Sequence, residues 1–152
     1  MALRAGRLSN EERLTILIEL GEIAREKYNK NLFFGAGSYN LGILKDSLQY
    51  APNTEEFENY YWVDAGSERL NEISNFFEYG TGLFNTKRKG KSRPIKSKSG
   101  KVMKFKSSKT GKMVFAKQVK GVKPVFMFTK TMRTMEFDRQ YLQRQIRVKL
   151  GI

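Results

Sequence analysis

Apolar and polar residues follow a helical period near the start of the chain. Ser9 and Glu12 form an S-x-x-E capping box, in which each side chain accepts a hydrogen bond from the backbone N–H of the other residue. Apolar residues then recur at helical spacing, and most charged residues fall on the other side. This pattern predicts an amphipathic helix that ends near residues 29–31. Its apolar stripe comprises Leu14, Leu17, Ile18, Ala24 and Tyr28, widened by Leu20 and Ile23.

Shorter elements follow over residues 33–77. FFGAGS indicates a loop, and NLGILKDSLQYAP predicts a short second helix that ends before Pro52. PNTEEFEN predicts a polar turn, and the aromatic and β-branched residues of YYWVDAG predict a strand. For SERLNEISNFF the periodicity leaves two structures open, a helical turn capped by Ser67 or an irregular crossing.

Two alternating segments, VMKFK and MVFAKQV, predict a β-hairpin near residues 102–119. The intervening SSKTGK places Gly111 where a turn needs a positive φ angle. Each strand has one apolar face and one mixed or lysine-bearing face, which predicts a half-buried sheet. The hairpin residues that we single out as candidates for contact with a partner are Lys104, Phe105, Lys106, Gly111, Phe115 and Lys117.

A C-terminal amphipathic helix is predicted to begin near Phe126, just after Pro124. Arg139 interrupts its apolar stripe, and Phe137 and Tyr141 lie off that stripe, either facing a neighbour or flanking the core. We therefore predict one α+β domain over residues 1–152, in which an N-terminal and a C-terminal amphipathic helix cover a small antiparallel sheet with a β-hairpin. The stripe comprises Phe128, Met132, Met135, Leu142 and Ile146.

Charge is divided unevenly along the 152 residues. The net charge is +14, but residues 1–83 carry −5 and residues 84–152 carry +19, with no acidic residue between Glu78 and Glu136. This split implies a partner of opposite sign for the basic half, or the acidic half of a neighbouring copy; the alternative is a solvated loop that keeps the chain soluble. A basic extended loop is predicted at about residues 84–101, with Lys87, Arg88, Lys89, Lys91, Arg93, Lys96, Lys98 and Lys101 as its contact residues.

Catalytic chemistry is poorly represented. The chain has no cysteine and no histidine, which excludes thiolate catalysis and removes the side chain best suited to proton transfer near neutral pH. Gly90-Lys91-Ser92 fails the phosphate-loop pattern G-x-x-x-x-G-K-[ST], because Asn85 stands where its first glycine belongs. We expect no enzyme, no cofactor and no metal site.

Membrane and secretion signals are also missing from the sequence. No apolar run approaches the roughly 18 residues of a membrane span. The N-terminal MALRAGRLSNEER has no apolar stretch typical of a signal peptide. We expect no contact with a membrane.

Nucleic acid is a second candidate partner for the basic half. Many lysines along a loop and a hairpin would bind phosphates by releasing counterions, with strong salt dependence and little sequence preference. Lysine outnumbers arginine, and lysine gives no bidentate reading of bases. Non-specific binding to a nucleic-acid backbone is therefore the alternative function.

A short glycine-containing stretch, Glu78-Tyr79-Gly80-Thr81-Gly82, precedes the basic loop. Its two glycines predict a turn with a positive φ angle at Gly80 or Gly82, in which Thr81 packs or forms a local hydrogen bond. That turn does not explain why Glu78 is the last acidic residue before the basic stretch.

Four short patterns occur in a fixed order and resemble the tail-completion proteins of tailed bacteriophages, also called head–tail joining or neck proteins. In that family E-[FY]-G-T-G precedes a hairpin of the form G-K-x-L-x-F … G-x-x-V-F-A-K-x-V, and K-P-x-x-[MF]-F opens the last helix. The resemblance covers about the C-terminal half of the chain. The matching positions are Glu78–Gly82, Gly100–Phe105, Gly111–Val119 and Lys123–Phe128.

The resemblance implies a structural virion protein. Members of the family form a homo-oligomeric ring that completes the tail and joins it to the head, coaxially with the DNA channel. The expected partners are further copies of this chain, the tail-tube protein and the head connector, with non-specific contact to DNA in the channel. The expected location is the neck of the virion, and the host cytoplasm during assembly.

Overall fold

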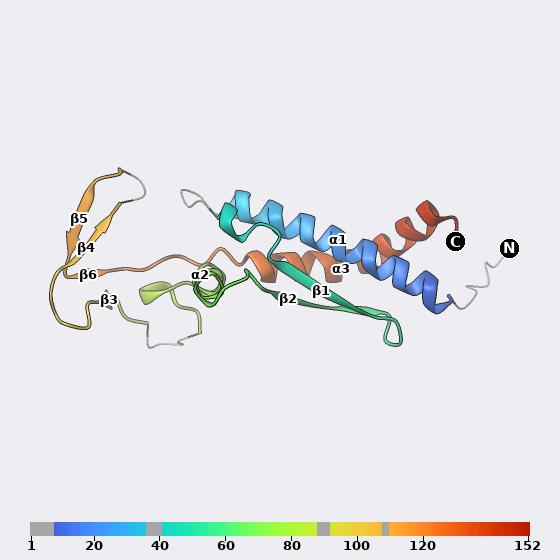
Figure 1. Cartoon of the computed structure of the whole chain (residues 1–152), viewed down its shortest axis with the longest axis horizontal. Helices are drawn as coiled ribbons and strands as arrows, with labels where there is room; N and C mark the ends of the chain where they lie inside the picture. The colour runs from blue at the N-terminus through green and yellow to red at the C-terminus, as the bar shows by residue number, and fades with distance from the viewer. Residues whose placement is uncertain (1–7, 36–40, 88–91, 108–109) are drawn as a thin grey trace.

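The computed structural model describes residues 8–35, 41–87, 92–107 and 110–152. In this part of the chain three α-helices and six short strands form an α+β fold, which confirms the predicted class. The strands form three separate antiparallel pairs, β1–β2, β3–β6 and β4–β5, where we expected one small sheet (Figure 1). The helices are α1 (Asn10–Gly35), α2 (Glu68–Tyr79) and α3 (Met127–Leu150). The strands are β1 (Leu48–Asn53), β2 (Glu58–Val63), β3 (Ile95–Lys96), β4 (Met103–Lys106), β5 (Met113–Ala116) and β6 (Gln118–Val119).

Helix α1 begins with the predicted capping box. The Ser9 N–H donates to Glu12 Oε2 at 2.7 Å, and the Glu12 N–H donates to Ser9 Oγ at 3.2 Å. The helix continues past its predicted end to Gly35. The polar side chains that suggested an end have partners in other elements: Asn29 Nδ2 donates to Asp46 at 2.7 Å, and Asn31 Nδ2 donates to Thr131 at 2.9 Å.

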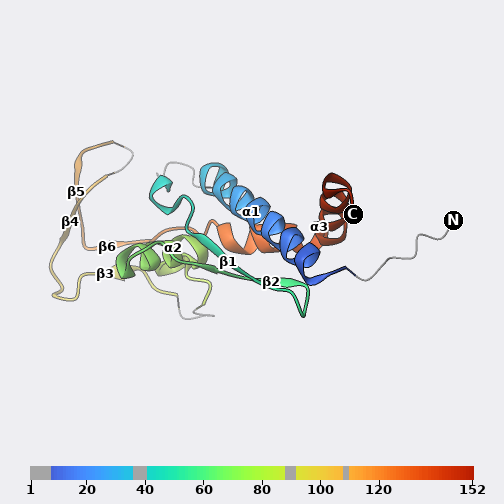
Figure 2. The same ribbon diagram turned by 45° about the vertical axis from the view of Figure 1, so that its right-hand side comes forward.

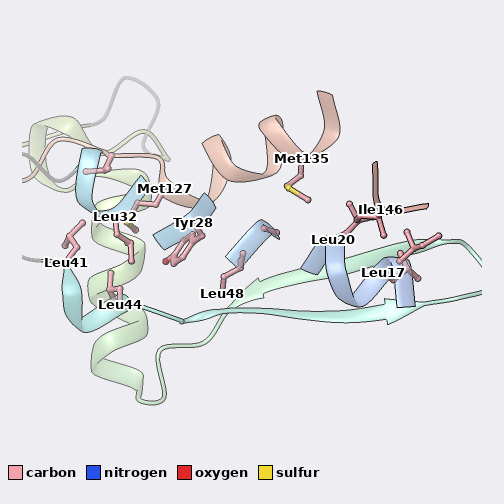
Figure 3. Packing of buried hydrophobic residues seen from close by; sticks show 13 residues of the cluster. Leu17, Leu20, Tyr28, Leu32, Leu41, Leu44, Leu48, Met127, Met135 and Ile146 are labelled. Atoms are coloured by element: carbon pink, nitrogen blue, oxygen red, sulfur yellow. The ribbon is translucent and has the colours of Figure 1, made fainter. Parts of the chain in front are cut away.

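The core lies where α1 packs against α3 and β1 (Figure 3). Ile16 is fully buried, whereas Leu14 and Ile18 are exposed, so the buried stripe of α1 is rotated from the predicted one. On α3, Met135 and Ile146 of the predicted stripe are buried, and Met127 and Thr131 join them. The apolar core residues drawn with labels in Figure 3 are Leu17, Leu20, Tyr28, Leu32, Leu41, Leu44, Leu48, Met127, Met135 and Ile146.

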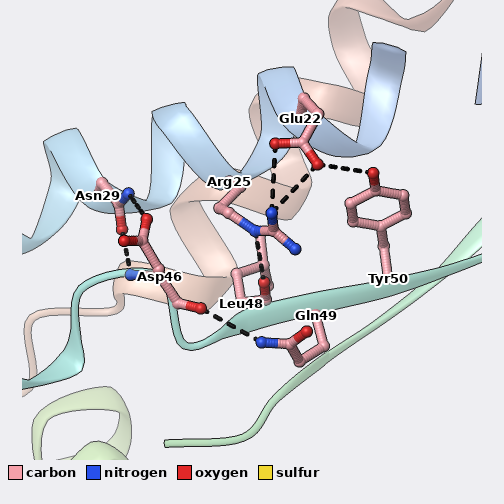
Figure 4. Close-up of polar contacts among 7 residues, drawn as sticks. All are labelled: Glu22, Arg25, Asn29, Asp46, Leu48, Gln49 and Tyr50. Carbon is pink, nitrogen blue, oxygen red and sulfur yellow. Dashed lines mark hydrogen bonds and ion pairs between the residues drawn. The ribbon is translucent and has the colours of Figure 1, made fainter. Parts of the chain in front are cut away.

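The short helix predicted at residues 40–51 is wrong. Only a single 3-10 turn, η1 (Gly42–Leu44), is present. Asp46 then adopts a φ angle of 61°, and strand β1 begins at Leu48. Tertiary contacts favour the strand: Leu48 is buried, its carbonyl oxygen accepts a hydrogen bond from Arg25 Nε at 3.2 Å, and the Tyr50 hydroxyl donates to Glu22 at 2.7 Å (Figure 4). The pKa of Tyr50 is raised to about 12, mainly by partial burial and secondly by the hydrogen bond to Glu22.

The predicted strand and turn before α2 are both present. Strand β2 pairs with β1 in the register Leu48↔Val63 and Pro52↔Asn59, and the polar turn joins them. Ser67 caps α2, because its Oγ accepts a hydrogen bond from the Leu70 N–H at 3.2 Å. The stretch after Ser67 is therefore a regular helix.

The predicted hairpin is confirmed as β4–β5, with Phe105 opposite Val114. It does not form a half-buried sheet on the helices. In Figures 1 and 2 it lies at the far end of the molecule, beyond α2, and most of its side chains are exposed. Its lysine-bearing face and its short strands leave too little apolar surface to compete for the core that α1, α3 and β1–β2 share.

Gly21 lets α1 approach β1 closely. A Cβ at this position would overlap the ring of Tyr50. We expect Gly21→Ala to lower the free energy of unfolding by about 1–3 kcal/mol, because the added methyl group overpacks this contact. In a Tyr50→Ala background the same change should be neutral or stabilising, since alanine favours a helix over glycine by about 1 kcal/mol. Urea unfolding of the four variants measures the coupling; an equal cost in both backgrounds contradicts the close packing.

Candidate functional site

A long basic excursion leaves the helical part of the chain and returns to it. We call residues 85–119 the basic arm; it contains 13 lysine and arginine residues and no acidic residue. It starts just after the 3-10 turn η2 (Gly82–Phe84), includes β3, β4 and β5, and ends with β6. The rest of the chain carries all 15 acidic residues.

The two ends of the arm are fastened together by hydrogen bonds. Thr81 N–H donates to the Val122 carbonyl at 2.9 Å, Leu83 N–H donates to the Lys120 carbonyl at 2.8 Å, and Val122 N–H donates to Thr81 Oγ1 at 2.8 Å. We call this junction of residues 80–83 with residues 120–122 the clasp. The predicted turn is thus present, and Thr81 forms a hydrogen bond across the clasp to a residue far along the chain.

Both glycines of the turn adopt positive φ angles, 75° at Gly80 and 57° at Gly82, as predicted. A Cβ on Gly80 would overlap the carbonyl oxygen of Phe84, and one on Gly82 would overlap the carbonyl oxygen of Lys120. Backbone atoms cannot rotate away as a side chain does. The clasp therefore requires glycine for its close approach as well as for its φ angles.

The contacts of Glu78 explain why an acidic residue stands directly ahead of the basic stretch. Only 5% of it is exposed, and its carboxylate accepts hydrogen bonds from the N–H groups of Phe128 at 2.8 Å and Thr129 at 2.9 Å, and from the Thr129 hydroxyl. These groups belong to the first turn of α3, whose own N-cap residue, Phe126, provides no side-chain cap. Glu78 is therefore a capping carboxylate supplied by α2.

Tyr79 fastens the first residues of the arm. Its carbonyl oxygen accepts hydrogen bonds from the Thr86 N–H at 2.9 Å and the Thr86 hydroxyl at 3.0 Å. Lys87 Nζ lies 3.7 Å from the centroid of the Tyr79 ring, in a cation–π contact. All the contacts described for the predicted turn, residues 78–82, are contacts within the chain.

The described lysine and arginine residues of the arm form no ion pair with any other described residue. The ion pairs found there, Arg25–Glu22, Lys27–Asp138 and Lys149–Glu19, include none of the arm residues. Arg88, Lys89 and Lys91 lie outside the described residues. The predicted contact residues that the structure describes are all exposed: Lys87, Arg93, Lys96, Lys98, Lys101, Lys104, Lys106 and Lys117.

The predicted loop at residues 84–101 contains a strand pair that alternation did not reveal. Ile95 pairs with Val119 and Lys96 with Gln118, so the arm is bridged a second time beyond the clasp. Only two residues on each side take part, too few to show a period in the sequence. This pair holds the two limbs of the arm side by side before the β4–β5 hairpin.

Apolar side chains are also exposed on the arm. Phe115 is 65% exposed, and Val102, Phe105 and Met113 are exposed as well. Lys104 Nζ lies 5.7 Å from the centroid of the Phe115 ring, which places cation and ring on one face of the hairpin. Gly111 has the predicted positive φ angle, 67°, in the turn of this hairpin.

Sequence patterns missed the second half of the clasp. Lys120 and Val122 form hydrogen bonds with Leu83 and Thr81, which lie 37 and 41 residues earlier in the chain. Thr129 lies 51 residues after its partner Glu78. GVKP gives a turn signal at this point and no pairing signal. The partners of Glu78 and Thr81 become visible only in three dimensions.

The remaining surface offers little chemistry. The described residues hold no group of three His, Cys, Asp or Glu side chains placed to bind a metal ion. A hollow of about 250 Å³ lies between α1, β2 and α3, where Arg139 donates a hydrogen bond to the Phe57 carbonyl at 2.6 Å. None of the described helices is both long and apolar enough to cross a membrane.

Comparison with known proteins adds no relative: no family model, no curated protein and no solved structure matches this chain.

The Glu78 cap gives a first prediction for this site. Glu78→Gln keeps the shape of the side chain but replaces one acceptor oxygen with a donor and removes the charge. We expect the free energy of unfolding to fall by about 1–3 kcal/mol, because two partly buried N–H groups in the first turn of α3 lose a charged acceptor. The control is Glu72→Gln, an exposed change on the same helix, which should stay within about 0.5 kcal/mol of the parent in urea unfolding. Similar losses in both variants would refute the capping role.

The clasp gives a second prediction. Gly82→Ala should open the clasp, so the amides of Thr81, Leu83 and Val122 should exchange hydrogen faster while helical circular dichroism is retained. Gly66→Ala is the matched control: Gly66 also has a positive φ angle, 84°, but a Cβ there meets nothing. Both changes carry about 1–3 kcal/mol of backbone strain. Equal exchange at the three amides in both variants would show that the clasp tolerates a side chain.

Proposed function

We propose that this chain is a structural, non-catalytic subunit of the neck of a tailed bacteriophage. Copies of it form a ring that completes the tail and joins it to the head connector. The proposal is supported above all by the basic arm, which is fixed at its base. Its described lysine and arginine residues are exposed and take part in none of the ion pairs among described residues. The resemblance of residues 78–128 to tail-completion proteins supplies the biological setting.

Assembly would explain why the chain carries an arm with so many like charges. Like charges along one segment repel one another and favour an arrangement in which opposite charges lie between them. A cyclic ring needs two different surfaces on each subunit, one of which meets the other on the next subunit. An arm rich in lysine and a body that holds every acidic residue meet this requirement.

The neck position adds three expected partners. The ring would contact the tail-tube protein on one side and the head connector on the other, and arm lysines that face the channel would contact DNA without reading its sequence. The corresponding location is the virion, reached from the host cytoplasm during assembly.

A non-specific nucleic-acid-binding protein is the second candidate, because exposed lysines on an arm also suit phosphate backbones. The two functions differ in what the arm requires. Nucleic-acid binding predicts tight association of the free chain with duplex at physiological salt and a steep loss with added salt. Ring assembly predicts self-association, or association with tail tubes, in the absence of nucleic acid.

The proposal is tested on virions and with arm variants. Antibody to this chain should label purified particles where head and tail meet. Reversal of Lys96, Lys98 and Lys101 to Glu should abolish restoration of infectious particles in extracts that lack the chain, and should leave helical circular dichroism unchanged.

The control reverses Lys30, Lys45 and Lys130, which are exposed on the body and change the net charge equally. It should restore particles as the parent does. Virions without this chain, or equal failure of both triple variants, would argue against the neck assignment.

A further inference from the structure

One face of the β1–β2 hairpin packs against α1, and the other carries exposed aromatic side chains. On the covered face Asn59 is buried and its Nδ2 donates to the Leu17 carbonyl of α1 at 2.7 Å. Side chains alternate along a strand, so Tyr60 and Trp62 point the opposite way, away from the helices. Tyr60 is 50% exposed and Trp62 46% exposed. Two large aromatic side chains thus lie next to each other on the same face, and about half of each is exposed.

Acidic side chains border these aromatic rings. Glu55 and Glu56 lie in the turn between β1 and β2, Glu58 opens β2, and all three are exposed. Glu56 accepts a hydrogen bond from the Tyr60 hydroxyl, and none of the ion pairs among described residues includes any of the three. We call Glu55, Glu56, Glu58, Tyr60 and Trp62 the acidic aromatic face.

The β4–β5 hairpin has the complementary composition. Lys104 and Lys106 alternate with Phe105 on β4, and they lie across from Phe115 and Met113 on β5. Lys104 and Lys106 therefore share one face of the hairpin with Phe115 and Met113, as Glu58 shares one face of β2 with Tyr60 and Trp62. Burial of apolar area and pairing of lysine with carboxylates and aromatic rings would both favour contact between the two.

The β4–β5 hairpin and the turn that carries Glu55 and Glu56 lie at opposite ends of one molecule. Figures 1 and 2 show β4 and β5 beyond α2, at the end of the molecule away from the turn that joins β1 and β2. The clasp and the β3–β6 pair hold the arm in that direction. Contact between the two surfaces therefore has to form between copies, head to tail, which is the kind of interface that generates a ring when the rotation closes.

Charge favours this face over the exposed aromatic surface of α3. Phe137 of α3 is 89% exposed and Tyr141 is exposed beside it. Arg133 and Arg144 flank these rings at helical spacing, so that surface carries the same sign as the arm. Like charges across an interface disfavour contact.

We propose that the β4–β5 hairpin of one copy docks on the acidic aromatic face of the next copy. This inference rests on the proposed ring and identifies the surface that the arm occupies in it. Lys104 and Lys106 meet Glu55 and Glu58, and Phe115, which shares their face of the hairpin, covers Trp62. The occupant is a second copy of this chain.

Trp62 reports directly on this contact, because it is the one tryptophan of the chain. When copies assemble, its emission should shift to shorter wavelength and its quenching by acrylamide should fall several-fold. Assembly without either change, or quenching that falls only when duplex DNA is added, overturns the docking surface. A chain that stays monomeric at every concentration overturns it as well, whereas the neck assignment is then decided by labelling of virions.

Cross-linking identifies the two sides. A zero-length carbodiimide reagent joins lysine to carboxylate, and a mixture of ¹⁴N and ¹⁵N protein separates links between copies from links within one copy. Links between copies should connect Lys104, Lys106, Lys112 or Lys117 with Glu55, Glu56 or Glu58. If arm lysines are instead linked to Glu136 or Asp138 of α3 in another copy, the proposed docking surface is wrong. The proposed ring is not contradicted by that result.

Charge exchange provides the decisive variants. Glu55→Lys with Glu58→Lys should weaken self-association about tenfold, and Trp62→Ser about 30-fold. Combining the Glu55 and Glu58 reversals with Lys104→Glu and Lys106→Glu should restore most of the lost association.

The matched control is Glu26→Lys with Glu72→Lys, two exposed positions on α1 and α2 that change the net charge equally. Its association should match that of the parent chain. Equal weakening by the control pair, or no rescue in the four-residue exchange, rejects the contact.

Discussion

The buried carboxylate of Glu78 is the contact on which the arrangement of the chain depends. A charged side chain in the interior is stable only where donors surround it, and here the first turn of α3 supplies two N–H groups and a hydroxyl. Helix α3 in turn lacks a cap of its own and gains one from α2. The end of α2 and the start of α3 are thereby fixed together, although the whole basic arm lies between them in the sequence.

This fixation decides how the arm can behave. Because both ends of residues 85–119 are held at the clasp, the arm leaves and returns at one place and cannot spread over the body as a free tail would. Two-stranded hairpins with little apolar cover are marginally stable in water. The β4–β5 hairpin therefore depends on its anchored base and, under the proposed function, on the neighbouring copy that covers it.

Much of the architecture was readable from local patterns, and its connections were not. The capping box predicted the start of α1, alternation predicted β4 and β5, and paired glycines predicted the positive φ angles of the turn. The strand at Leu48–Asn53 was read as a helix, because the spacing of Leu41, Leu44 and Leu48 imitates a helical period until packing against α1 decides it. The role of Glu78 was invisible, since its partners lie 50 and 51 residues away.

The separation of charge gains a physical meaning from this geometry. Lysines of the arm that paired with glutamates of the same chain would hold the arm against the body. The described arm residues instead take part in no ion pair with described residues. The arm extends beyond α2, away from the turn between β1 and β2 (Figure 1). Glycines at the clasp hold that extended direction by allowing a backbone approach that any side chain would block. Under the proposed function, the exposed lysines of one copy's arm lie against glutamates of the next copy and gain carboxylate partners there. The clasp thus directs the lysines away from the glutamates of their own body, which is the arrangement that the proposed head-to-tail ring requires.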